Sequence, residues 1–102
     1  MTEPDIVVFR RWRDTGEVIA LFPELPADLN SDYCDSYMHV GQHGGADFHG
    51  VVQQTTPCSP EASADLAAEL ETIGYHLRPI GRASRVHHDN RRRTASDLRK
   101  MT

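Results

Sequence analysis

Three histidines and one aspartate stand within eleven residues near the middle of the chain: His39, His43, Asp47 and His49. Imidazole nitrogens and carboxylate oxygens are good ligands for zinc and similar divalent ions. Three such ligands, with a water molecule at the fourth position, would form a hydrolytic site in which a nearby acid such as Asp35 serves as base. One hypothesis for function is therefore a small metal-dependent hydrolase.

The glycines around these residues favour a different interpretation. Residues 41–50 contain four glycines, which is typical of a loop, and nothing there indicates the helix on which a His-x3-His pair would share a face. We therefore favour partly exposed histidines that hydrogen-bond to neighbouring carbonyls. Zinc or another divalent metal is the alternative cofactor. A metal-free pairing of histidine with aspartate, or of Cys34 with a histidine, also stays open.

A second candidate feature is the basic C-terminal end. Residues 78–102 contain eight basic and two acidic residues, whereas residues 1–77 contain three basic and thirteen acidic ones. This asymmetry indicates an acidic body with a basic tail, whose densest part, Arg91, Arg92 and Arg93, would attract phosphates. The alternatives are a tail that lies on the acidic body and a tail that folds on binding another protein. The net charge of −4 is unlike that of typical nucleic-acid binders.

A third candidate surface surrounds the single tryptophan. Trp12 ends a strand-like run and is flanked by three arginines at positions 10, 11 and 13. Such a group can stack on bases or hold a protein partner. The structural alternative is that Trp12 covers the core while the arginines extend their apolar stems along it.

The elements that must position these residues follow from local patterns. Alternating β-branched and aromatic residues predict a hairpin, and the strand pattern returns later in the chain. A Ser-Pro start and a glycine stop delimit one amphipathic helix. We expect strands at 5–13, 18–22, 33–40, 51–55 and 75–80, a loop at 41–50, and a helix at 60–73.

This order of elements predicts an α+β fold. The expected architecture is a small antiparallel sheet, made of the hairpin and two or three further strands, with one helix packed on one face. The 102 residues suit one modest core. We place the compact domain at residues 1–81 and expect residues 82–102 to be a flexible or weakly helical tail.

The chain has no apolar run near the roughly 20 residues that a membrane helix requires. Its acidic start lacks the basic and apolar segments of a secretory signal, so we expect a cytoplasmic protein with no membrane partner.

The stretches RRWRDTGEVIALFPELP and SYMHVGQHGGAD, with a later helix that ends LETIGYHL, resemble a group of small bacterial proteins of unassigned function. The resemblance covers about residues 7–80 and implies no activity, cofactor or catalytic residue. The leading functional expectation is therefore a small accessory binding module that contacts protein or nucleic acid through the basic tail and residues 41–50.

Overall fold

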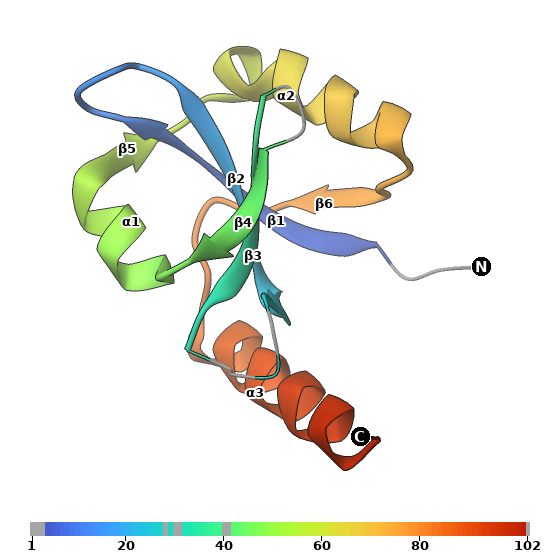
Figure 1. Ribbon diagram of the computed structural model, residues 1–102. Helices are drawn as coiled ribbons and strands as arrows, with labels where there is room; N and C mark the ends of the chain where they lie inside the picture. The colour runs from blue at the N-terminus through green and yellow to red at the C-terminus, as the bar shows by residue number, and fades with distance from the viewer. Residues whose placement is uncertain (1–3, 28, 30–31, 40–41, 102) are drawn as a thin grey trace.

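The computed structural model describes residues 4–27, 29, 32–39 and 42–101, and it confirms an α+β fold (Figure 1). Within these residues the chain forms six strands and three helices. Their bounds are β1 Asp5–Trp12, β2 Val18–Pro26, β3 Cys34–Met38, β4 Gln42–Ala46, α1 Phe48–Gln54, β5 Thr55–Pro57, α2 Pro60–Ile73, β6 Leu77–Pro79 and α3 Arg85–Lys100.

The strands form one sheet in the order β4-β3-β2-β1-β5, and β6 also pairs with β1. All pairs are antiparallel except β1–β6, which is parallel. The predicted hairpin of β1 and β2 is confirmed: Val8 lies opposite Leu21, and Gly16 has a φ of 76° in the turn. Two short strands share the far edge of β1, with β6 along Asp5–Val7 and β5 along Arg10–Trp12.

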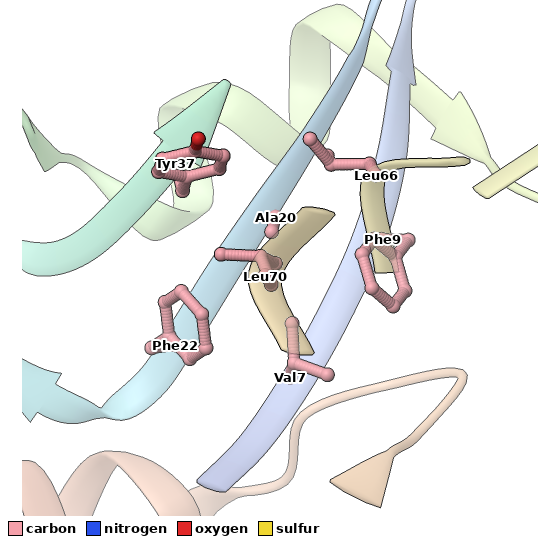
Figure 2. Close-up of a cluster of buried hydrophobic side chains, with 7 residues drawn as sticks. All are labelled: Val7, Phe9, Ala20, Phe22, Tyr37, Leu66 and Leu70. Atoms are coloured by element: carbon pink, nitrogen blue, oxygen red, sulfur yellow. The ribbon is translucent and has the colours of Figure 1, made fainter. Parts of the chain in front are cut away.

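Helix α2 covers one face of the sheet. Leu66 and Leu70 of this helix pack on side chains from the three central strands, as Figure 2 shows: Val7, Phe9, Ala20, Phe22 and Tyr37. The sequence signals for this helix are confirmed at both ends. Ser59 Oγ accepts a hydrogen bond from the backbone N–H of Ala62 at 3.2 Å, and Gly74, with a φ of 124°, ends the helix.

The opposite face of the sheet has a core of its own. Val8, Ile19, Leu21 and Cys34 pack there with Phe48 of α1, and α3 packs against β2. The structure therefore adds helices to the face that the one-helix expectation left open. The reason lies in the strands: β1 and β2 are apolar on both faces, so each face must be covered.

Local structure differs from expectation in three segments. Residues 42–46 form strand β4 instead of a loop, and 48–54 form helix α1 where a strand was expected over 51–55. Strand β2 continues to Pro26 through a register shift after Phe22, although prolines usually end a ladder.

The C-terminal segment is a packed helix. Arg91 of α3 is 5% exposed, and its Nη1 donates to the carbonyl of Pro23 in β2 at 2.6 Å. His88 and Ala95 are buried on the same helix. Of the two alternatives for residues 82–102, a flexible or a weakly helical tail, the structure has a helix over Arg85–Lys100, whose few apolar residues are supplemented by a buried arginine that satisfies a carbonyl of the sheet. Among the residues described, no helix has the length and apolar character needed to span a membrane.

Candidate functional site

The four residues predicted to bind a metal lie in two separate places. His43 of β4 points to the α2 side of the sheet, where its ring centroid is 4.6 Å from that of Tyr37. His49 lies in α1 on the other side, with its ring centroid 5.2 Å from that of His88. Asp47 precedes α1 as its N-cap residue, and His39 is at the end of β3. The chain leaves the sheet at Ala46 and crosses to the opposite face, which separates the histidines.

The structure does not bring these four residues together around one point. Within residues 4–27, 29, 32–39 and 42–101, no group of three or more His, Cys, Asp or Glu side chains is placed to hold a metal ion. Asp35, the predicted base, lies beside His43. Burial raises the pKa of Asp35, while the Ser36 backbone N–H and His43 oppose that rise.

His39 is instead part of a contact between β3 and α2. Its Nδ1 is hydrogen-bonded to one carboxylate oxygen of Glu69, and the hydroxyl of Tyr37 donates to the other. A groove of about 500 Å³ lies beside this contact. Its lining combines two acidic residues, Glu17 and Asp65, with His39 and apolar side chains.

The arginines at 91–93 are not displayed together. Arg91 is buried against β2, and Arg92 Nη1 pairs with Asp89 on the same helix at 2.9 Å. Arg93 lines a recess that also contains Asp5 and Glu24. The three arginines named as candidate contacts for phosphates or a partner therefore point in different directions, because helical geometry spreads three consecutive residues around the axis.

Trp12 lies at the end of β1, beside α1. The side chain is half-buried and packs against the core on the α1 side of the sheet. Part of its surface is therefore covered by the core. The neighbouring Arg10 lies on the same face and leads to a different site.

A pocket of about 190 Å³ lies between β1, α1, the segment after β6 and the start of α3. Val8, Phe48, Val52, Gly81 and Ala83 supply its apolar and backbone walls. Four basic side chains complete it: Arg10, His49, Arg82 and His88. None of the described residues that line this pocket is acidic. Four basic groups thus converge from four different elements of an acidic protein.

Arg10 is held in place by the end of α1. Its Nε donates to Thr55 Oγ1 at 2.9 Å, and its Nη2 donates to the carbonyls of Val52 and Thr55 at 3.1 and 2.9 Å. A cation at a helix C-terminus is favourable, because the carbonyl dipoles of the helix give that end a partial negative charge. Burial, and then the nearby Arg13, lower the pKa of Arg10. The guanidinium stays charged, with Nη1 left as a donor.

His88 is held by Arg91. Arg91 Nη1 lies 2.8 Å from His88 Nδ1, and because a guanidinium can only donate, Nδ1 must accept. The imidazole is therefore neutral, with its proton on Nε2. Burial lowers the pKa of His88, and the charges of Arg91 and His49 lower it further. The ring also packs edge-on against Phe48, with the centroids 4.9 Å apart.

This arrangement suits binding better than proton transfer. A general acid must exist in its protonated form, but Arg91 blocks the nitrogen that His88 would need to protonate. What the pocket offers is two permanent positive charges, from Arg10 and Arg82, and imidazole donors beside them. Such a set matches an oxyanion, above all a phosphate group.

Sequence reasoning missed this pocket although it noted most of its parts. Arg10 belonged to the tryptophan surface, Arg82 and His88 to the tail, and His49 to the supposed metal loop. Only the pairing of β1 with both β5 and β6 brings these segments together. The absence of acidic residues around 78–88 was the one available signal.

Comparisons with known proteins add no assignment. No protein-family model matches the chain, and searches of the curated proteins and of the solved structures found no match. The resemblance to small bacterial proteins stays a prediction from sequence.

Proposed function

We propose that this protein is a small accessory binding module that takes up a phosphate group in the pocket between β1, α1 and α3. The observation that carries the proposal is the convergence of Arg10, His49, Arg82 and His88 with no acidic residue among the described lining. This keeps the binding-module expectation and moves its site from the arginine run to the pocket.

The charge of the surroundings supports the same proposal. The chain carries a net charge of −4, so its overall field does not favour anions. The described lining of this pocket nevertheless holds two arginines and no acidic residue, a combination that suits an anion. Within the described part of the chain Arg82 is exposed and makes no ion pair or hydrogen bond, so it is available to a ligand.

The test is an NMR titration of the ¹⁵N-labelled protein with sodium phosphate at constant ionic strength, with sodium chloride as the reference. We expect saturable shifts centred on the backbone amides of residues 81–88 and on the Arg10 side chain. A second arm uses a short 5′-hydroxyl oligonucleotide, because the phosphate could be free or part of a nucleic-acid backbone.

A matched pair of variants provides the control. R82Q removes a pocket charge, whereas R78Q removes an exposed charge from β6, outside the pocket lining. We expect R82Q to weaken phosphate binding about tenfold and R78Q to leave it within about twofold, since a charge-assisted contact is lost only in the first. The proposal fails if neither phosphate nor the oligonucleotide gives saturable shifts, or if the two variants behave alike.

A further inference from the structure

We infer that the ligand of this pocket is a small phosphomonoester with a compact apolar or aromatic group, and not the phosphodiester backbone of a nucleic acid. This inference rests on the proposed function and specifies its ligand. Three observations support it: the charge of the pocket, its apolar walls, and the contacts that the arginines outside the pocket make.

The charge of the pocket matches a dianion. Arg10 and Arg82 supply two positive charges, while His88 is held neutral by Arg91 and adds a donor without adding charge. A phosphomonoester carries roughly −1.5 to −2 near pH 7, whereas each backbone phosphodiester carries a single negative charge. A terminal phosphate would therefore offset both guanidiniums, and a diester would leave one uncompensated.

The walls of the pocket call for more than a bare phosphate. Val8, Phe48, Val52 and Ala83 form an apolar side next to the basic one. A volume of about 190 Å³ exceeds what one phosphate fills, because a water molecule occupies roughly 30 Å³ in the liquid. It is also below the roughly 300–1,000 Å³ of pockets for drug-sized ligands. The space fits a phosphate with one small ring or short chain against Phe48 and Val52.

Outside the pocket, the arginines of α3 are largely engaged within the protein. Arg85 and Arg92 flank Asp89, at 3.9 and 2.9 Å, and Arg99 Nη1 donates to the carbonyl of Leu29 at 2.7 Å. Arg91 is buried. A nucleic-acid strand requires a basic track that follows successive phosphates. Along the described part of α3, acidic partners and burial therefore interrupt such a track.

The experiment compares three ligands by NMR titration at constant ionic strength and pH 7.5: inorganic phosphate, phenyl phosphate and a 5′-hydroxyl RNA hexamer. We expect phenyl phosphate to bind about tenfold more tightly than inorganic phosphate, and the hexamer to leave the pocket resonances unchanged. The V52T variant changes the apolar wall and keeps the charges. It should reduce the advantage of phenyl phosphate over inorganic phosphate by about half or more.

The outcomes separate this inference from the proposed function. Equal affinity for inorganic and phenyl phosphate would overturn the inference and leave phosphate binding intact. Binding of the hexamer at least as tight as that of phenyl phosphate would also overturn it, in favour of nucleic acid. If none of the three ligands binds, the proposed function fails, and the inference fails with it.

Discussion

Arg91 provides the sharpest test of how the C-terminal helix is held. The side chain is 5% exposed, and its Nη1 donates both to the Pro23 carbonyl at 2.6 Å and to His88 Nδ1 at 2.8 Å. The substitution R91M keeps an unbranched stem of similar length but removes every donor. It leaves a buried carbonyl and a buried ring nitrogen without the hydrogen bonds that they now accept.

We expect R91M to lower the free energy of unfolding by roughly 2–4 kcal/mol, since each buried group left unsatisfied costs about 1–3 kcal/mol. The substitution also removes a buried positive charge, and the burial of that charge, which lowers the pKa of Arg91, is itself unfavourable. The loss of stability is therefore smaller than the sum of the costs of the two unsatisfied groups. The assay is urea unfolding followed by tryptophan fluorescence, because Trp12 packs in the core.

The matched control is R92Q, which also removes one positive charge but lies on the exposed side of α3, where its partner is Asp89. We expect a change within about 0.5 kcal/mol for this variant. If R91M and R92Q destabilise the protein equally little, α3 is not held to β2 as described, and the interpretation of residues 82–102 as a loose tail returns.

Three further predictions concern the core and its titrating groups. His88 has a pKa below its ordinary value of 6.5 because of burial and the nearby Arg91, so the unfolded chain takes up a proton that the folded protein does not. Stability should therefore fall as the pH drops through 6.5, and H88Q should show a smaller loss between pH 7.5 and 5.5 in urea unfolding. Leu70 of α2 is fully buried against the sheet, so L70A should cost about 2–5 kcal/mol in the same assay, and a loss below 1 kcal/mol would contradict the packing. Burial raises the pKa of Cys34 to about 11, so at pH 8 a thiol reagent should label the half-buried Cys58 in the native protein and Cys34 only after unfolding. Equal labelling of both thiols in the native state would refute this.

The sequence by itself determined the elements whose signals are local. The hairpin of β1 and β2 follows from two apolar runs around a turn with Gly16, and α2 follows from Ser59, Pro60 and Gly74. In each case the residues that specify the element lie within or directly beside it. Caps, turns and alternation act over a few residues, so they can be read without the rest of the chain.

Tertiary structure decided the elements whose local signals were weak. Residues 48–54 became a helix because Phe48 reaches the second core of the sheet, although their apolar run suited a strand equally well. Helix α3 has few large apolar residues, and it packs through Arg91 on a carbonyl that only the extended β2 presents. Neither outcome can be derived from the segment alone, because the deciding partner is distant in sequence.

The candidate site belongs wholly to the second group. The sequence shows that the chain is rich in histidine and arginine, and that His39, His43 and His49 lie close together along it. The fold separates His43 from His49 across the sheet and joins His49 to Arg10, Arg82 and His88. The physical reason is that strand pairing fixes which segments meet, and the pairing of β1 with β5 and β6 spans more than forty residues in sequence.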